Sequence, residues 1–386
     1  MHLTNLRDLF LIDPNIIFFN HGSFGACPRP VFEVYQDWQR ELERQPVEFL
    51  GRRFGALMEE ARGVLAAFLG TGRENLFYTT NATTALNIVA RSLPLGPGDE
   101  ILSNNHEYGA LDQTWEFVCS KRGCRYVRPT ISLPIRSAEE VIETIWQGVS
   151  ERTRVLFISH ITSPTGLIFP IAPLIRRARE RGILTVIDGA HAPGQVPLDL
   201  EALGADFYAG NCHKWLMSPK GAAFLYARPE VQPLLEPLVV SWRNMSLSAS
   251  PFIAANEFQG TRDIAAYLSV PAAIQFRKDY NWDNVQEYCY ELLVYARREI
   301  LKILGLPAIC PEDPEWICQM AAHLLPPGDG AALKTRLYEE YGIEIPVQEM
   351  GAQQFLRISI QGYNTRAEVD TLLRALERLI PEYTTC

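Results

Sequence analysis

The stretch FYAGNCHKWLMSPKGAAFLY, residues 207–226, places a histidine and a lysine between two apolar runs. Each run has the length and composition of a buried strand. An ammonium group taken out of water costs several kcal/mol unless it is paired or loses its proton. Lys214 therefore needs a special chemical environment, and the sequence on either side indicates what that environment is.

The sequence around this stretch alternates short apolar runs with amphipathic segments. Repeated strand–helix–strand units favour a mostly parallel sheet covered by helices on both faces, so we predict an α/β fold. In such folds ligands bind beyond the carboxyl ends of the strands. Two of the intervening helices are expected at 137–151 and 171–182. The predicted strands are 75–80, 99–104, 125–129, 154–159, 183–188, 205–210 and 222–227.

The pattern changes after about residue 265, where longer helical segments replace the alternation. We expect helices over 283–304, near 330–341 and over 365–379, with the runs EWICQMAAHLL and QFLRISI between them. This is an α+β pattern. We therefore predict a large domain over residues 16–264 and a smaller C-terminal domain over residues 265–386, which also includes residues 1–15.

Composition argues against several classes of protein. The 386 residues carry 36 Lys and Arg against 45 Asp and Glu, and a net charge of -9 does not suggest a nucleic-acid or anionic-membrane partner. The N-terminal stretch MHLTNLRDLFLIDPN does not have the pattern of a signal peptide, and no apolar stretch approaches a membrane span. The cysteines lack CxxC spacing, so we expect reduced thiols, a cytoplasmic protein and no metal site. They lie at 27, 119, 124, 212, 289, 310, 318 and 386.

Polar and titratable residues gather where the predicted strands end, in NATTALN, NHEYGA, HITSPTG, DGAHAPG and NCHKW. A helix predicted to begin near Ala82 presents unpaired N–H groups, which bind phosphate readily. Thr83 and Thr84 add hydroxyl donors to it. The same residues also fit an ordinary threonine N-cap.

Asp188 ends a predicted strand, where a carboxylate either caps the next helix or pairs with a buried cation. His191 follows three residues later, and Lys214 follows the next strand. These groups suit pyridoxal 5'-phosphate: a lysine forms a Schiff base with its aldehyde, an aspartate keeps its ring nitrogen protonated, and a helix end holds its phosphate. We therefore predict this cofactor.

These motifs resemble those of a known enzyme family. VIDGAHAPG followed by CHKW and SPKG is similar to the class V aminotransferases, pyridoxal-phosphate enzymes of fold type I that include cysteine desulfurases, kynureninases and isopenicillin N epimerases. FFNHGSFGACP (18–28), HEYGALDQTW and FQGTRD resemble the isopenicillin N epimerase-like branch most. The resemblance extends over nearly the whole chain, and it implies a seven-stranded sheet with a smaller C-terminal domain.

The resemblance also implies roles for residues around the cofactor ring. Lys214 corresponds to the Schiff-base lysine, with Lys220 in SPKG as the competing candidate. Asp188 would pair with the pyridine nitrogen, and His191 would lie near the phenolic oxygen. Tyr108 would stack on the ring, although a buried core aromatic is the alternative. His106 is the weaker candidate for stacking.

Further roles concern the phosphate and the substrate. His213 would help Lys214 to close on the phosphate. A Gly260–Thr261 pair from the neighbouring subunit of a homodimer would reach the same phosphate. Ser163 stands in SPTG where relatives have NPTG, which leaves its role near the phenolic oxygen open. Arg357 corresponds to the arginine that clamps a substrate α-carboxylate; a solvent-facing strand arginine is the alternative. Asn20 and His21 are expected on the substrate side.

The predicted activity is chemistry at Cα or Cβ of an L-amino acid or an amino-acid-containing peptide. Epimerisation is the first expectation, a cysteine or cysteine-conjugate C–S lyase is the alternative, and transamination or cysteine desulfuration ranks lower. A desulfurase needs a cysteine shortly before Arg357, where YGIEIPVQEMGAQQFLRIS has none; Cys318 is expected in the core of a strand. A non-enzymatic relative would have lost Lys214 or Asp188, and a nicotinamide enzyme would carry a G-x-G-x-x-G turn after a strand, which is not found here.

Overall fold

The computed structural model describes residues 6–242 and 250–383, so Cys386 lies outside the described residues. Its helical elements are η1 (Leu6–Leu9), α1 (His21–Phe24), α2 (Arg29–Arg44), the π-helical turn η2 (Glu48–Arg53), α3 (Phe54–Leu69), α4 (Ala82–Ser92), α5 (Gly109–Arg122), α6 (Ala138–Trp146), α7 (Ile171–Glu180), α8 (Leu200–Leu203), η3 (Pro229–Leu234), α9 (Pro251–Asn256), α10 (Ala265–Leu268), α11 (Val270–Asp279), α12 (Trp282–Leu304), α13 (Gly330–Tyr341) and α14 (Arg366–Tyr383).

The strands are β1 (Ile17–Phe18), β2 (Leu76–Thr79), β3 (Glu100–Leu102), β4 (Arg125–Val127), β5 (Thr153–Ser159), β6 (Leu184–Asp188), β7 (Phe207–Asn211), β8 (Ala223–Ala227), β9 (Met320–Leu324), β10 (Ile343–Glu344), β11 (Val347–Met350) and β12 (Gln353–Ser359). Each of the seven strands predicted between residues 75 and 227 overlaps one of the strands β2 to β8.

These seven strands form one sheet in the order β2-β8-β7-β6-β5-β3-β4. The pairs from β7 through β6, β5 and β3 to β4 are parallel, whereas β8 runs antiparallel to both β7 and β2. The prediction of a mostly parallel seven-stranded sheet is confirmed. Because β7 and β8 are antiparallel neighbours, residues 212–222 form a long turn at one edge of the sheet, and this turn carries Lys214.

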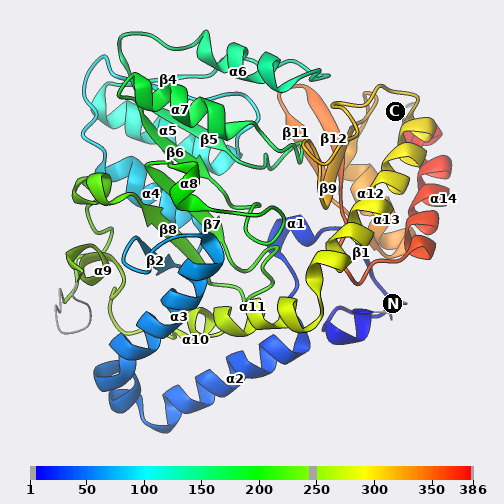
Figure 1. Cartoon of the computed structure of the whole chain (residues 1–386). Coiled ribbons are helices and arrows are strands. Elements are labelled where there is room, and N and C mark those ends of the chain that lie inside the picture. The colour runs from blue at the N-terminus through cyan, green and yellow to red at the C-terminus, as the bar shows by residue number, and fades with distance from the viewer. Residues whose placement is uncertain (1–5, 243–249, 384–386) are drawn as a thin grey trace.

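Helices cover both faces of this sheet (Figure 1). Successive side chains of a strand point to opposite faces, so Phe77 packs with α4 and α5 while Tyr78 faces α3. Helices α6 and α7 contribute to the same core as α3. Two apolar layers therefore enclose the sheet, and its strand ends are left as the place where polar residues can gather. No described helix is long and apolar enough to span a lipid bilayer.

The C-terminal region is built on a second sheet, in which β12 pairs antiparallel with β11 and β9. Helices α12, α13 and α14 pack together beside it (Figure 1). The helices predicted over 283–304, near 330–341 and over 365–379 are confirmed as α12, α13 and α14. Cys318 lies in a bend just before β9 rather than within a strand, so that detail of the prediction was wrong.

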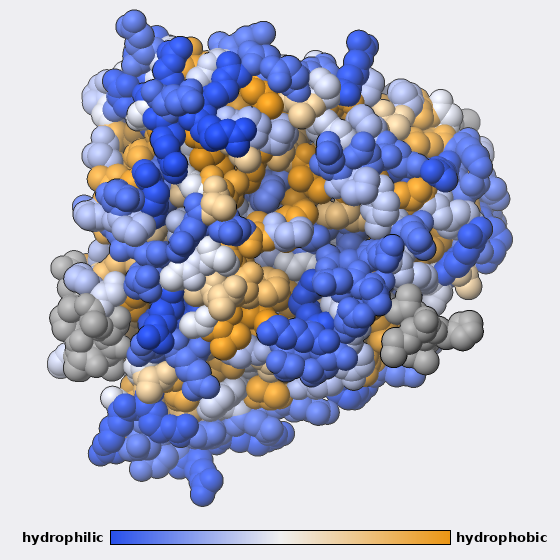
Figure 2. Space-filling model, viewed as in Figure 1, coloured by the Kyte–Doolittle hydropathy of each residue, from blue (hydrophilic) through white to orange (hydrophobic). Residues whose placement is uncertain are grey.

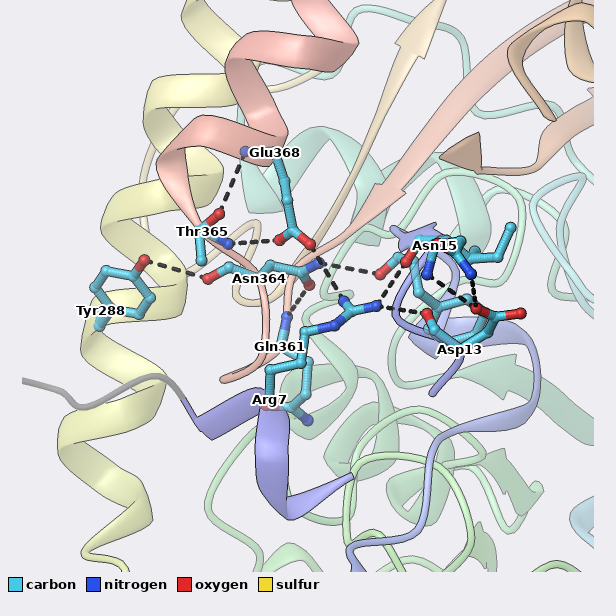
Figure 3. Close-up of polar contacts among 10 residues, drawn as sticks. Arg7, Asp13, Asn15, Tyr288, Gln361, Asn364, Thr365 and Glu368 are labelled. Carbon is cyan, nitrogen blue, oxygen red and sulfur yellow. Dashed lines mark hydrogen bonds and ion pairs between the residues drawn. The ribbon is translucent and has the colours of Figure 1, made fainter. Parts of the chain in front are cut away.

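The N-terminal segment is fastened to the C-terminal region, as Figure 3 shows. Arg7 Nη1 lies 3.2 Å from Glu368 Oε1, and Asn364 Nδ2 donates to the backbone oxygen of Phe18 at 3.1 Å. Strand β1 also pairs with β10. Helices α10 and α11 pack against α2 and α3. The division of the chain into domains at residue 264/265 stays a prediction.

Candidate active site

A cavity of about 490 Å³ lies where strands β5, β6 and β7 end and helix α4 begins. This is the location that a mostly parallel sheet predicts for a ligand. Hydrophilic side chains cover much of the rim of the face drawn in Figure 2, while hydrophobic ones gather nearer its middle. The cavity is lined by Gly22, Ser23, Phe24, Thr80, Asn81, Ala82, Thr83, Tyr108, Ser159, Ile161, Ser163, Asp188, Ala190, His191, Asn211, His213, Lys214, Gly221, Gln348 and Arg357.

Lys214 reaches the cavity from the turn between β7 and β8. Its Nζ lies 3.1 Å from His191 Nε2. The pKa of the Lys214 ammonium is lowered to about 7: burial is the main cause, the positive charge of Arg357 acts in the same direction, and the negative charge of Asp188 opposes both. A substantial fraction of Lys214 is therefore an uncharged, nucleophilic amine at neutral pH.

Lys220, the competing lysine, does not line this cavity. Its Nζ donates to the backbone oxygen of Gly25 at 3.0 Å, and it borders a separate hollow beside Cys27 and Phe32. Of the two lysines in the turn, the structure therefore brings only Lys214 together with Asp188, His191 and Arg357.

Asp188 ends β6 and is buried. Its Oδ1 accepts a hydrogen bond from the backbone N–H of Ala190 at 2.9 Å, but no helix begins there for it to cap. Burial raises the pKa of its carboxyl group, whereas the Ala190 N–H and the charge of Lys214 lower it. Asp188 Oδ2 has no hydrogen-bond partner within the described chain. Asp188 lines the cavity, where a cationic ligand group would offset the cost of burying its charge.

His191 is buried between Lys214 and Trp215. Trp215 Nε1 lies 3.3 Å from His191 Nδ1, on the side of the ring opposite to Lys214. Burial lowers the pKa of His191 well below its usual value, and the nearby charges of Lys214 and Arg357 act in the same direction. The imidazole is therefore neutral at physiological pH.

The N-terminus of α4 supplies fewer free donors than the sequence suggested. The cap is Asn81 rather than a threonine: its Oδ1 accepts from the N–H of Thr84 at 2.7 Å. The N–H of Ala82 donates to Asn211 Oδ1 at 2.9 Å. The N–H of Thr83 has no acceptor within the described chain, and Thr83 lines the cavity whereas Thr84 does not. An anion would therefore bind mainly at Thr83, with Thr80 beside it.

His213 also lines the cavity, next to Lys214 in the turn. Its Nδ1 lies 3.0 Å from the backbone oxygen of Ala222, and burial lowers its pKa to about 4. A carbonyl oxygen only accepts, so Nδ1 carries the proton of the neutral ring.

The sequence left two alternatives open, a buried core aromatic for Tyr108 and a solvent-facing arginine for Arg357, and the structure excludes both. Tyr108 is 45% exposed, so it is no core aromatic. Arg357 lies on β12 and is buried, so it does not face solvent. Its Nη1 donates to the backbone oxygen of Ser163 at 2.5 Å and its Nη2 to Ser23 Oγ at 3.3 Å. Arg357 Nε is buried without a partner among the described residues. Because buried donors are normally paired, this free N–H is available to a bound anion.

Asn20 and His21 do not line the cavity, and their place on the substrate side stays a prediction. Asn20 Nδ2 donates to Glu344 Oε1 at 2.8 Å, and the buried His21 contacts Tyr363 and the backbone of Lys214. The residues directly after them, Gly22 to Phe24, line the cavity instead.

Gly25 explains why this segment can lie so close to Lys214. Its φ is +70°, and a Cβ there would stand 2.0 Å from the backbone oxygen of His213. Only glycine permits both this backbone conformation and this approach. The motif NHGSFG is therefore a close-packing element against the turn that carries Lys214.

Several predicted residues lie outside the cavity lining. His106 is buried, with its ring nitrogens 3.0 Å from Thr165 Oγ1 and 3.1 Å from the backbone oxygen of Ile131. Gly260 is not among the lining residues, and neither is Thr261, whose side chain is exposed. Cys318 Sγ lies 2.8 Å from Gln195 Oε1, and none of the described cysteines lines the cavity.

The sequence did not single out Ser159, Asn211, Gln348 or Glu107. Ser159 and Asn211 are the last residues of β5 and β7, a position that was itself a usable signal. Glu107 is buried behind Ser159, with Oε1 3.0 Å from its backbone nitrogen and Oε2 2.5 Å from its Oγ, and burial raises the pKa of Glu107 to about 8. Gln348 comes from the C-terminal region, and no sequence motif linked it to this site.

The arrangement fits pyridoxal phosphate. A phosphate would fit the N-terminus of α4, a pyridine nitrogen would fit the second oxygen of Asp188, and an aldehyde would be within the chemistry of the Lys214 amine. The size and polarity of the cavity suit a phosphorylated aromatic ligand. Arg357 in its lining suits the carboxylate of a substrate joined to that ligand.

Comparisons with known proteins agree with this chemistry. The sequence model described as aminotransferase class-V matches residues 26–372. The chain belongs to the class V aminotransferase family. The members of this family are pyridoxal-phosphate enzymes, and so is this one.

Curated relatives in the family have several activities. An isopenicillin N epimerase from Amycolatopsis lactamdurans is 38% identical, over 97% of this chain and 98% of its own. A probable chloroplastic L-cysteine desulfhydrase from Arabidopsis thaliana is 28% identical, over 97% and 85% of the two chains.

Solved structures share the fold. A cysteine desulfurase from Escherichia coli superposes with a TM-score of 0.82 over 99% of both chains at 23% identity. The cystine C–S lyase C-DES, solved with its product cysteine persulfide, gives a TM-score of 0.79 at 21% identity, over 95% of this chain and 98% of its own. The fold-type-I prediction is confirmed.

Proposed function

We propose that this class V aminotransferase-family enzyme epimerises an L-amino acid, or the amino-acid part of a peptide, at Cα. The observation that carries the proposal is the convergence of Lys214, Asp188, His191 and Arg357 on one cavity, in a chain that is 38% identical to an isopenicillin N epimerase over almost its full length. When bound, pyridoxal phosphate takes up the electron pair that is left on Cα after its proton is removed.

The side chains then have separate tasks. Lys214 attaches the cofactor and, once released by the incoming amino acid, removes the α-proton as a neutral amine. Asp188 pairs with the pyridine nitrogen, and His191 donates toward the phenolic oxygen. Arg357 binds the α-carboxylate in a bidentate contact and so fixes the direction of the Cα–H bond.

The phosphate is proposed to lie against Thr83 and Thr80, with His213 beside it. Gly260 and Thr261 are proposed to reach the phosphate of the partner subunit in a homodimer, since Thr261 is exposed and outside the cavity of its own chain. The role of Ser163 is to hold Arg357, because its backbone oxygen and Oγ are 2.5 and 3.4 Å from Nη1. We also propose that the protein is cytoplasmic.

Epimerisation needs an acid that protonates Cα from the face opposite to Lys214. Three titratable side chains in the motifs were candidates: Tyr108, His106 and His21. His106 and His21 are buried outside the cavity lining, whereas Tyr108 lines it and is 45% exposed. Tyr108 is therefore the proposed second acid, in addition to its proposed stacking on the ring.

A C–S lyase acting on cysteine or a cysteine conjugate is the second candidate. It needs no second acid, because a thiolate leaves from Cβ after Lys214 has taken the α-proton. The relatives named cysteine desulfhydrases support it at 28% identity. Sulfur transfer to an enzyme cysteine is less favoured, because no described cysteine lines the cavity.

One experiment separates these reactions. Isopenicillin N and L-cysteine are incubated with the enzyme in deuterium oxide, and deuterium at Cα, optical purity, pyruvate and ammonia are measured together. Epimerase activity gives deuterated product of the opposite hand, whereas lyase activity gives pyruvate and ammonia. The Tyr108→Phe variant is expected to keep α-proton exchange and lose inversion. Loss of neither function in this variant would remove Tyr108 from the proposal.

A further inference from the structure

A row of buried side chains connects the C-terminal region to Lys214. Tyr363 Oη lies 2.9 Å from His21 Nδ1, and the His21 ring packs against Trp215 with ring centroids 4.8 Å apart. Trp215 Nε1 lies 3.3 Å from His191 Nδ1, and His191 Nε2 lies 3.1 Å from Lys214 Nζ. The reaction roles proposed above use neither Trp215 nor His21.

The contact between Trp215 and His191 has only one consistent arrangement of protons. An indole N–H is a donor and cannot accept, so His191 Nδ1 must be the acceptor. A neutral imidazole carries one proton, which therefore sits on Nε2. Nε2–H points at Lys214, and its partner at 3.1 Å must be the lone pair of an uncharged amine.

We propose that Trp215 is a positioning residue that fixes His191 in its Nε2–H tautomer, so that His191 donates a hydrogen bond into the cavity and holds Lys214 in its uncharged form. The effect on Lys214, as the reactive amine, rests on the proposed function. The tautomer itself does not depend on which reaction the enzyme carries out.

The opposite tautomer would have the opposite effect on Lys214. With the proton on Nδ1, Nε2 would become an acceptor and would stabilise the ammonium form. Asp188 also raises the pKa of Lys214 and Arg357 lowers it, and the buried His21 and His213 lie nearby. These other groups are unchanged when only the indole N–H is removed, so its effect can be isolated.

His21 has a place in this arrangement although it does not line the cavity. Its Nε2 lies 3.0 Å from the backbone oxygen of Lys214 and 3.4 Å from Gln361 Nε2. The carbonyl oxygen only accepts, and it is the nearer of the two, so Nε2 carries the proton and Tyr363 Oη donates to Nδ1. His21 thus supports the face of Trp215 and the backbone of Lys214 together.

The tautomer is measured directly on the full chain labelled with ¹⁵N-histidine, first freed of cofactor and then reloaded. Long-range ¹H–¹⁵N correlation spectra distinguish a protonated ring nitrogen from an unprotonated one, and the His191→Gln variant identifies the His191 signals by their loss. We expect His191 to show a protonated Nε2 and an unprotonated Nδ1. In Trp215→Phe, which keeps an aromatic ring and loses the N–H, the Nδ1 signal should shift toward the protonated position.

Trp282→Phe is the matched control. Trp282 is also buried, and its Nε1 has no acceptor within the described chain, so this variant removes an indole N–H without touching His191. Its His191 signals should equal those of the unaltered protein. A wild-type His191 protonated on Nδ1, or a Trp215→Phe spectrum with unchanged His191 signals, overturns the proposal.

A second readout follows the amine itself. The rate at which cofactor-free protein takes up pyridoxal phosphate falls as Lys214 becomes protonated, so its pH dependence reports the pKa of Lys214. Trp215→Phe should move the midpoint of this profile to higher pH, whereas Trp282→Phe should leave it in place. An unmoved midpoint in a folded Trp215→Phe protein contradicts the effect on Lys214 even if the enzyme proves to be a lyase.

Discussion

Two regions of this molecule bury charged side chains, and they treat them in opposite ways. Arg62 on α3 and Glu257 after α9 form an ion pair in which both side chains are about 95% buried. The pair is also hydrogen-bonded on both sides: Arg62 Nε donates to the backbone oxygen of Arg73 at 3.1 Å, and Glu257 Oε1 accepts from the N–H of Tyr78 at 3.3 Å.

The cavity region holds Lys214, Asp188 and Arg357 without such closure. Arg357 Nε and Asp188 Oδ2 have no partners within the described chain, and Lys214 Nζ contacts a neutral histidine rather than a carboxylate. Burying a charge is costly unless it is paired. The charges of Arg62 and Glu257 pair with each other and stabilise the fold, whereas those around the cavity remain available to pair with a ligand. Incomplete pairing, rather than burial, distinguishes the candidate active site.

The largest expected effect comes from removing the lysine of the incompletely paired region. Lys214→Ala should lower turnover by about 10²- to 10⁴-fold or more, because both the attachment of the cofactor and the proton transfer are lost. Lys220→Ala, in the same turn, should retain most of the activity. Borohydride reduction followed by peptide mapping should place the pyridoxyl label on Lys214. A label on Lys220 would reverse the assignment.

The paired region should respond in stability rather than in activity. Glu257→Gln leaves Arg62 buried without a counter-charge and should cost about 3–5 kcal/mol in the free energy of unfolding. Urea unfolding of the cofactor-free protein measures it. The double variant Arg62→Met/Glu257→Met should recover most of this loss, because neither charge then remains. A double variant as unstable as the single one would mean that the pair itself, rather than an orphaned charge, sets the effect.

The pH dependence of stability should reveal the cost of burying Lys214. Its pKa is lowered from 10.5 to about 7 in the folded chain, so above pH 7 the unfolded chain binds more protons than the folded one. Stability due to this group therefore rises with pH, by up to about 1.4 kcal/mol per pH unit, between about pH 7 and 10.5. Lys214→Met should remove this slope from unfolding curves of the cofactor-free protein. Equal slopes in both proteins would argue against a neutral Lys214.

The smallest expected effect tests the proposed contribution of a second subunit. Thr261→Ala should weaken cofactor retention by about 1 kcal/mol, roughly fivefold in Kd, through the loss of one hydrogen bond to the phosphate. Mixed with Lys214→Ala chains, it should regain part of the activity, because a heterodimer contains one intact site. Gln259→Ala, next to the pair, serves as the control. A protein that stays monomeric at micromolar concentration would exclude this contribution.

The sequence predicted the framework of the site well. Seven apolar runs became the seven strands of the large sheet, and the residues that follow them became much of the cavity lining. The reason is local: strand length, alternation and the polar residues at strand ends are properties of short segments. The link between Asp188, His191 and Lys214 followed from the same rule, since parallel strands end at one edge of a sheet.

Other features of the site were decided by contacts between distant segments. Asn211 Oδ1 accepts a hydrogen bond from the N–H of Ala82, so within the described chain the N–H of Thr83 remains the backbone donor available to a ligand at the start of α4. Gly25 lets the segment 18–28 approach His213, so that Gly22 to Phe24 rather than Asn20 and His21 line the cavity. Neither partner in these contacts carries a signal of the other in its own sequence.

The sequence by itself thus determined the fold class, the cofactor and the residues that are chemically able to bind it. Only the tertiary structure decided which of these residues face the cavity, which are satisfied behind its wall, and which charges stay unpaired. The physical reason is that residue type and local periodicity fix what a side chain can do and which element carries it. The direction in which it points, and the partner it meets, depend on packing between segments that are hundreds of residues apart, as Arg357 and Ser23 are.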